Sequence, residues 1–428
     1  MMPTWQSEAA LPSIEGLGAR RAALQMIDGV LRRGQTLAAS AGAARGLAPN
    51  DQALAAAIAG EVFRRLPDLD AWIDSATKNV LADDSKARAV LRLALAQKIG
   101  LNTPDHAIVA TALPLVDGGP RRLVHGVLGT LLRRAIPDMD PPQLPLAVDY
   151  RWTKQWGEDA VMAARRQIAT RPSLDLIFKD DGAAQVFAES NGGEMVAQRS
   201  LRLPSANVAG IAGFAAGDWW VQDLAASLPA RLIPRGAHSV LDLCAAPGGK
   251  TMQLAAAGHS VTALDLSAER LERLSENLKR TGLAATLVTA DALDWVPTTA
   301  PDAILLDAPC SSTGTFRRHP EVLTRARPAI IMQMAELQGR MLDHAATIVA
   351  PGGTLVYGTC SLERGEGEDV VSAFLARNPG FEVRPPAPGE LPDFIPIAGD
   401  GSVRILPGLL EDRGGLDGFF IARLVARA

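Results

Sequence analysis

Leu241-Asp-Leu-Cys-Ala-Ala-Pro-Gly-Gly-Lys-Thr251 is the stretch of this sequence that decides its fold. It starts as a short apolar run typical of a buried strand, turns at a glycine-rich loop and continues as a helix. A strand, a glycine-rich loop and a helix in this order are typical of the ligand-binding edge of an α/β sheet. The stretch therefore predicts an α/β domain with a ligand site at the start of the helix.

Short apolar runs separated by helical stretches continue from Arg235 onward, which is the pattern of a parallel sheet with crossover helices. The predicted strands are 239–243, 261–265, 286–289, 303–307 and 354–357. Farther along, Asp417-Gly418 between two apolar runs predicts a hairpin that adds antiparallel strands at one edge. Ligands of such sheets bind beyond the carboxyl ends of the strands.

The 428 residues suffice for two or three domains. Apolar residues recur at helical spacing from about 20 to 134, which predicts a compact helical domain over 1–140. Asn50 and Thr103 are predicted helix caps there, with Pro104 at a first helical position. Three arginine pairs are predicted to be surface charges: Arg64 and Arg65, Arg121 and Arg122, and Arg133 and Arg134.

The proline-rich segment 137–145 cannot continue a helix and predicts a linker. Beyond it, a predicted helix at 160–169 and predicted strands at 174–178 and 185–188 indicate a small α+β subdomain over 141–235. Residues 236–428 then form the α/β domain.

Composition excludes several classes of protein. The net charge of −4 argues against a strongly basic nucleic-acid coat, so any RNA contact must come from local patches. The first twenty residues carry Glu8 and Glu15 and lack a basic start, so no secretory signal is predicted. No segment has the roughly 20 apolar residues that span a bilayer. Three cysteines without CxxC spacing predict neither a disulfide framework nor a metal site, and we expect a cytoplasmic protein that does not enter a membrane.

Two nucleotide-binding interpretations of the glycine-rich loop fit poorly. A Walker A loop needs glycine five residues before Gly249-Lys250-Thr251, where this chain has Cys244. The G-x-G-x-x-G fingerprint of dinucleotide-binding proteins is absent. A methyl donor without phosphates fits better, because Gly248 and Gly249 let the backbone approach the ligand closely. At the ends of the next two strands, Asp265 is placed to accept hydrogen bonds from ribose hydroxyls and Asp291 lies where adenine would bind.

Two cysteines follow adjacent strands at the ligand edge: Cys310 after the strand that ends at Asp307, and Cys360 after the strand at 354–357. A single cysteine is more often a small buried apolar residue, but two at this edge indicate chemistry. Methylation of cytosine carbon 5 needs a thiolate that first adds to carbon 6 and pushes electron density onto carbon 5. Asp307 could bond the base edge and stabilise the developing charge. An amino-group methyltransferase would be expected to carry Asp-Pro-Pro-Tyr in place of Asp307-Ala-Pro-Cys310.

With these motifs in place, the sequence resembles the Nop/Sun family of RNA cytosine-5 methyltransferases, and within it the bacterial Sun/Fmu subgroup. The motifs that carry the resemblance are Phe214-Ala-Ala-Gly-Asp-Trp-Trp-Val-Gln-Asp223, Asp242-Leu-Cys-Ala-Ala-Pro-Gly-Gly-Lys-Thr251, Asp307-Ala-Pro-Cys-Ser-Ser-Thr-Gly314, Arg317-Arg-His-Pro-Glu321, Gly358-Thr-Cys-Ser361 and Asp417-Gly-Phe-Phe-Ile-Ala422. They span about half of the chain.

The resemblance implies a Rossmann-like class I domain with a mostly parallel seven-stranded sheet, S-adenosylmethionine as cofactor and 16S ribosomal RNA as substrate. It implies that Cys360 is the nucleophile and that Cys310 assists release of the methylated base. It also implies a cofactor site formed by Cys244, Ala245, Ala246, Pro247, Gly248, Gly249, Lys250, Asp265, Asp291 and Asp307. The helical N-terminal part resembles the NusB-type RNA-binding domain of the Sun subgroup.

The chain departs from the family in two places. The family often has Glu-Asn-Glu after its nucleophile, where this chain has Glu366-Gly-Glu368, and Val124-His-Gly-Val-Leu128 replaces a Val-Asn-Ala-Val-Leu-Arg segment. The reacting base must leave its stack, so single-stranded or looped RNA is expected, with Arg317, Arg318 and His319 as candidate phosphate contacts. A catalytically idle RNA-binding factor and a protein or DNA methyltransferase remain alternatives.

Overall fold

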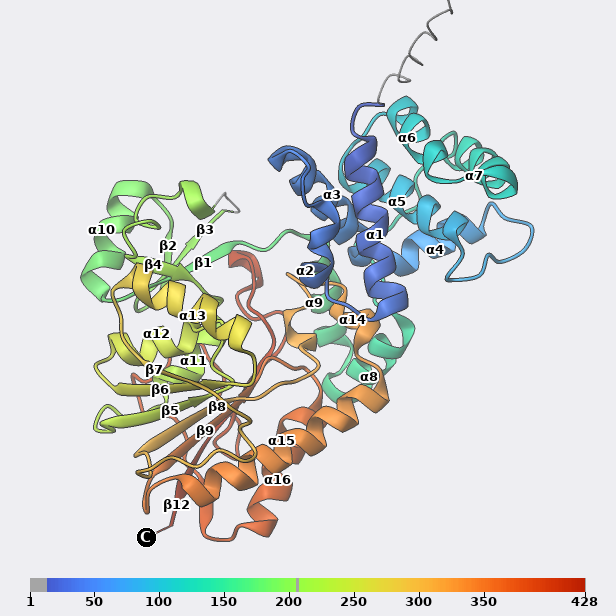
Figure 1. The fold of residues 1–428 in the computed structure, drawn as a ribbon. Helices are drawn as coiled ribbons and strands as arrows, with labels where there is room; N and C mark the ends of the chain where they lie inside the picture. Colours follow the sequence, from blue (N-terminus) through green and yellow to red (C-terminus); the bar gives the residue numbers. More distant parts are fainter. Residues whose placement is uncertain (1–13, 205–207, 428) are drawn as a thin grey trace, which may run out of the picture. The chain divides into compact units, whose positions relative to one another are not determined.

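The computed structural model describes residues 14–204 and 208–427, so the N-terminal segment with Glu8, where no secretory signal is predicted, lies largely outside it. The described residues form two compact units: those in 14–146 with 319–325, and those in 147–318 with 326–427 (Figure 1). Within the described ranges, no helix is long and apolar enough to cross a membrane.

The first unit is helical, as the sequence predicts. Its helices are α1 (Leu17–Arg33), α2 (Leu37–Ser40), α3 (Pro49–Arg64), α4 (Leu66–Asp74), α5 (Lys86–Gly100), α6 (Asp105–Ala112), α7 (Gly118–Leu131) and α14 (Val322–Arg325). Helix α5 lies at the centre: ten of its residues from Ala87 to Ala96 are buried, and α1, α3, α4, α6 and α7 pack around it.

Both predicted helix caps are wrong, by two residues at Asn50 and by one at Thr103. Helix α3 starts at Pro49, whose fixed φ begins the helix early, so Asn50 lies inside the first turn and Ala48 is the cap. Helix α6 starts at Asp105 because Pro104 keeps an extended ψ of 142° and serves as the cap in place of Thr103.

The prediction for the arginine pairs holds for two of the three. Arg121 and Arg122 and also Arg133 and Arg134 are exposed, whereas Arg64 is buried and Arg65 pairs with Glu61 at 2.9 Å. The Arg65 guanidinium also donates to the Met139 carbonyl at 3.0 Å, so this arginine is engaged within the helical unit.

The second unit begins with α8 (Leu146–Trp156) and α9 (Glu158–Ala169), and continues with a four-stranded antiparallel sheet in the order β2-β3-β1-β4. Its strands are β1 (Leu174–Phe178), β2 (Glu194–Ala197), β3 (Ser200–Leu203) and β4 (Trp219–Val221). The strand predicted at 185–188 is wrong, because this segment lies in helix α10 (Asp181–Asn191). Asp180 caps that helix, and its buried Ala184 and Phe187 are three residues apart, a helical spacing that the short apolar run concealed.

The main sheet has eight strands in the order β10-β12-β9-β8-β5-β6-β7, with β11 paired to β12. Its strands are β5 (Ser239–Leu243), β6 (Ser260–Asp265), β7 (Thr286–Thr289), β8 (Ala303–Asp307), β9 (Thr354–Thr359), β10 (Phe381–Val383), β11 (Val403–Ile405) and β12 (Phe419–Ala426). Strands β5 to β9 are parallel, and all five lie where the sequence predicts them. Strands β11 and β12 form the predicted antiparallel pair, but residues 406–418 connect them, so the connection is a long loop and not a tight turn at Asp417-Gly418.

Helices cover both faces of this sheet (Figure 1). Val240, Leu305 and Val356 pack against α11 (Leu224–Arg231) and α12 (Gly249–Ala256). The neighbouring residues Leu241, Ile304 and Leu355 point to the other face, against α15 (Pro328–Ile348) and α16 (Glu368–Arg377). This two-sided burial explains why the strands read as continuous apolar runs. Helix α13 (Ala268–Thr281) connects β6 to β7 and packs near Met252.

We expect Asp70→Ala to lower the free energy of unfolding of the helical unit by about 3 kcal/mol, because it leaves two buried guanidinium groups underpaired. Asp70 bonds Arg88 at 2.9 Å and Arg92 at 2.7 Å, and these side chains are 1% and 4% exposed. Urea unfolding, monitored by hydrogen exchange of the α5 amides, measures the change in the free energy of unfolding. The control is Asp83→Ala, which removes a 91% exposed partner of the same arginines and should change little. Equal losses in both variants would contradict the prediction.

Candidate active site

The glycine-rich loop connects β5 to α12 at the carboxyl edge of the main sheet. Cys244 has φ of 60°, a left-handed conformation that is uncommon outside glycine and clusters at functional sites. Gly248 has φ of 104° and lies so close to α13 that an added Cβ would meet the Leu274 side chain at 1.9 Å. Helix α12 starts at Gly249, so its free N–H groups face the loop.

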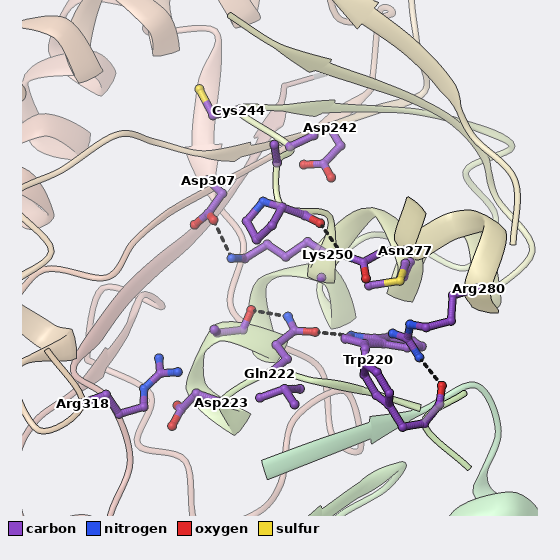
Figure 2. Close-up of a pocket in the computed structure, with 18 residues that line it drawn as sticks. Trp220, Gln222, Asp223, Asp242, Cys244, Lys250, Asn277, Arg280, Asp307 and Arg318 are labelled. Carbon is purple, nitrogen blue, oxygen red and sulfur yellow. Dashed lines mark hydrogen bonds and ion pairs between the residues drawn. The ribbon is translucent and has the colours of Figure 1, made fainter. Parts of the chain in front are cut away.

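A cavity of about 400 Å³ lies against this loop. Figure 2 shows Lys250 reaching toward Asp307, with its Nζ 2.6 Å from the Asp307 carboxylate, and Trp220 and Gln222 on the opposite wall. Arg280 stacks on Phe214 at 4.3 Å. The structure thus brings together the loop after β5 and the acid at the end of β8, as the sequence predicts.

The cavity offers a carboxylate to a positively charged group of a ligand. Asp242 lines it, and its Oδ1 is buried without a hydrogen-bond partner among the described residues, while its Oδ2 accepts from Thr251. Burial raises the pKa of Asp242 to about 7. An ammonium group in the cavity would satisfy this oxygen, and the loop backbone would bind the rest of an amino-acid-like ligand. S-Adenosylmethionine carries an ammonium group and a carboxylate on its amino-acid part.

Asp265 and Asp291 do not line this cavity. The Asp265 carboxylate is buried and accepts bonds from the Ala246 and Ser267 amides at 3.1 and 3.0 Å. Asp291 is exposed and accepts from the Leu293 amide at 2.9 Å. Their predicted ribose and adenine contacts therefore stay predictions.

Strand register brings the two predicted cysteines together. Asp307 of β8 pairs with Gly358 of β9, so both strands end at the same edge and their loops start side by side. The Sγ atoms of Cys310 and Cys360 lie 3.5 Å apart, and both residues are half-buried. The Gly314 amide donates to the Cys360 carbonyl at 3.0 Å, and a Cβ at Gly314 would meet the Gly418 carbonyl at 2.0 Å. Only glycine permits this close approach of the loops.

The pKa values of the two thiols are shifted in opposite directions. The hydrogen bond from the Cys310 thiol lowers the pKa of Cys360 and outweighs burial. The same bond, together with burial and the Glu366 charge, raises the pKa of Cys310 well above its usual value. Burial also raises the pKa of Cys244 to about 12, which excludes it as a thiolate near neutral pH. Cys360 is therefore the sulfur best suited to act as a nucleophile.

Sequence reasoning missed the carboxyl that lies under both cysteine loops. Glu366 is fully buried and accepts from the Ser311 amide at 2.8 Å and from the Ser361 hydroxyl at 2.5 Å. Each serine follows one of the cysteines. This segment differs from the family's Glu-Asn-Glu pattern, but its spacing in the sequence does not predict the hydrogen bonds between Glu366 and the two serines.

The prediction that Arg317 contacts a phosphate is wrong. Its guanidinium is 2% exposed and pairs with Asp223 and Asp417, so it cannot reach a phosphate. Arg318 also pairs with Asp417, but its side chain is 30% exposed and lines the cavity. These ion pairs fix the turn before β12. In the described parts of the chain, no group of three or more His, Cys, Asp or Glu residues could hold a metal.

Comparison with known proteins gives consistent results. The sequence model of the family described as 16S rRNA methyltransferase RsmB/F matches residues 229–425, and that of the NusB family matches residues 17–133. The ribosomal RNA small subunit methyltransferase B of Xylella fastidiosa (strain 9a5c) is 35% identical over 88% of this chain and 92% of its own length. The protein of the same name from Pseudomonas putida is 34% identical over 80% of this chain and 83% of its length.

Two solved structures share the fold of this chain. The protein PH0851 covers 98% of this chain and is itself fully covered, with a TM-score of 0.73 and 24% identity. A methyltransferase homologue from Pyrococcus horikoshii covers 65% of this chain, and 93% of it is covered, with a TM-score of 0.52 and 26% identity.

We expect Cys310→Ala to raise the pKa of Cys360, because the variant removes the hydrogen bond that stabilises the thiolate. Cys360 then reacts more slowly with iodoacetamide at neutral pH, and its pH profile moves upward. Peptide-resolved mass spectrometry follows the labelling. An unchanged or downward-shifted profile would contradict this assignment.

Gly314→Ala should separate the two loops, because the added methyl group collides with backbone on the β12 side. We expect alkylation of Cys360 at neutral pH to slow by about tenfold, equivalent to a pKa rise of about one unit. Gly365→Ala is the control, since its methyl group would find only the Ile331 side chain at 3.9 Å. Equal rates in the two variants would show that the close approach does not set the reactivity of the thiol.

Proposed function

The chain belongs to the RsmB/F family of 16S rRNA methyltransferases, which makes it an S-adenosylmethionine-dependent RNA methyltransferase, and we propose that it methylates carbon 5 of a cytosine through a transient covalent bond to Cys360. The observation that carries this proposal is the 3.5 Å contact between the Cys310 and Cys360 sulfurs at the edge where the glycine-rich loop lies. Methyl transfer to an amino group or an oxygen needs neither thiol.

The first step uses the acidity difference between the sulfurs. Cys360, as the thiolate, adds to carbon 6 of the cytosine, and the electron pair of the 5,6 double bond moves to carbon 5. The Asp307 carboxyl lies at the end of β8 and can bond the base edge, while Lys250 at 2.6 Å supplies a positive charge beside it. Residues 244–250 and Asp242 would hold S-adenosylmethionine, which would supply the methyl group for carbon 5.

Release of the product reverses the first step. When a base such as solvent water takes the proton from carbon 5, the electron pair of that carbon–hydrogen bond restores the double bond, and the carbon 6–sulfur bond breaks with its pair on Cys360. The protonated Cys310 lies 3.5 Å from this sulfur and donates a hydrogen bond that stabilises the departing thiolate. We therefore assign Cys360 to attack and Cys310 to release.

The substrate is a base that has left its stack, because a paired cytosine cannot present carbon 6 to a sulfur inside a loop cluster. Single-stranded or looped 16S ribosomal RNA meets this requirement, and the names of the relatives favour it. The NusB-like helical unit adds RNA contacts, for which the exposed Arg121 and Arg122 of α7 are candidates. Since ribosomal RNA is the substrate, the reaction takes place in the cytoplasm.

RNA with 5-fluorocytidine at the target position tests the covalent step, because fluorine replaces the proton that must leave carbon 5 and the adduct therefore persists. We expect a denaturation-resistant protein–RNA band with the unmodified chain and with Cys310→Ala, and none with Cys360→Ala. Cys244→Ala, which changes a thiol outside the pair, should still give the band. An adduct that survives Cys360→Ala but vanishes in Cys310→Ala would reverse the two roles, and no adduct in any variant would exclude a covalent mechanism.

A further inference from the structure

We propose that Glu366 is a positioning residue for this reaction: its buried carboxylate ties the Cys310 loop to the Cys360 loop and presents a negative charge to the first of them. The proposal rests on the roles given above to the two cysteines. The Glu366 carboxylate acts through the serines beside the two cysteines, with which it forms hydrogen bonds.

The carboxylate connects the loops atom by atom. One oxygen accepts from the Ser311 amide at 2.8 Å, and the other accepts from the hydroxyls of Ser311 and of Ser361, the latter at 2.5 Å. Ser311 follows Cys310 and Ser361 follows Cys360 directly in the sequence. Each serine is bonded to a cysteine in the chain, so a change at this carboxylate affects the positions of both sulfur atoms.

Glu366 is itself held from two sides. Its carbonyl accepts from the Tyr357 hydroxyl at 2.7 Å and from the Thr359 hydroxyl at 3.2 Å, both on β9. Gln338 of α15 donates to the Pro309 carbonyl at 2.8 Å and to the Glu366 carboxylate at 3.3 Å. These contacts attach Glu366 to the sheet and to the 21-residue helix α15, which hold its carboxylate in place between the two loops.

The hydrogen bonds around the carboxylate fit its ionised form. All four of its partner groups, two hydroxyls and two N–H groups, can donate, and an ionised carboxylate only accepts. No ion pair joins it to a cation within the described ranges, although burial raises the pKa of Glu366. A buried negative charge without a cation acts strongly on its neighbours, because the surroundings screen it poorly.

Cys310 is the neighbour that this charge affects. Three titratable groups face Cys310. Tyr357 lies on β9, Cys360 follows that strand, and Glu366 lies in the turn at Arg364–Glu366. Burial keeps Tyr357 protonated, since its pKa is raised well above the usual value. Glu366 is thus the fixed charge that favours the thiol form of Cys310, the form that donates to Cys360.

The test measures the acidity of Cys310 in the Cys360→Ala background, where the second sulfur is gone and no RNA is needed. Iodoacetamide labelling of the Cys310 peptide is followed against pH in the full chain, with and without Glu366→Gln. Glutamine keeps the size of the side chain and one accepting oxygen but removes the charge, and its NH2 group donates where the second oxygen accepted. We expect the labelling midpoint to fall by about 1 pH unit. The matched control is Asp369→Asn, which removes an exposed carboxylate three residues away and should leave the midpoint in place.

An unchanged midpoint in folded Glu366→Gln would overturn the proposal, since a merely structural residue would not move the acidity of Cys310. If that variant does not fold, Ser311→Ala removes one hydroxyl from the bridge and keeps the amide bond. We then expect a lower kcat with an unchanged KM for RNA, and an unaltered kcat would overturn the proposal. Because the labelling assay uses no substrate, failure of the covalent mechanism in the fluorocytidine assay leaves the Glu366 result interpretable, and the reverse also holds.

Discussion

The contact between two sulfur atoms depends on the register of two parallel strands. Asp307 and Gly358 pair at the ends of β8 and β9, and this pairing fixes where the following loops begin. Gly314 then lets the loops approach until the Cys310 and Cys360 sulfurs are 3.5 Å apart. A slip of one residue would turn the side chains of a strand to the other face of the sheet and separate the pair.

The surroundings give two chemically identical side chains different acidities. A hydrogen bond joins the two sulfurs, and the opposite pKa shifts make Cys310 its donor; the buried Glu366 adds negative charge on the Cys310 side. On the other side, Lys250 contributes to the low pKa of Cys360 and pairs with Asp307. One sulfur can therefore attack while the other remains a proton donor, which is the division of roles that a covalent route with reversible attachment needs.

The sequence predicts the parallel sheet well because its strands are buried on both faces and separated by clear helical stretches. It fails at 185–188, where three apolar residues within a capped helix resemble a strand. It places Cys310, Cys360, Asp307 and residues 244–250 at one edge, since parallel strands end together. Arg317 was misjudged because its partners, Asp223 and Asp417, lie about a hundred residues away. The serine contacts of Glu366 escaped for a related reason, because only the folded loops bring its carboxylate beneath Ser311.

Identification of the methylated nucleoside tests the central claim most directly. Small-subunit RNA is incubated with the chain and S-adenosylmethionine carrying an isotopically labelled methyl group, then digested to nucleosides and analysed by mass spectrometry. The account predicts that the label appears as 5-methylcytidine and is lost with Cys360→Ala. Label in N4-methylcytidine or in a ribose-methylated nucleoside, or labelled 5-methylcytidine that persists without the Cys360 sulfur, would contradict it.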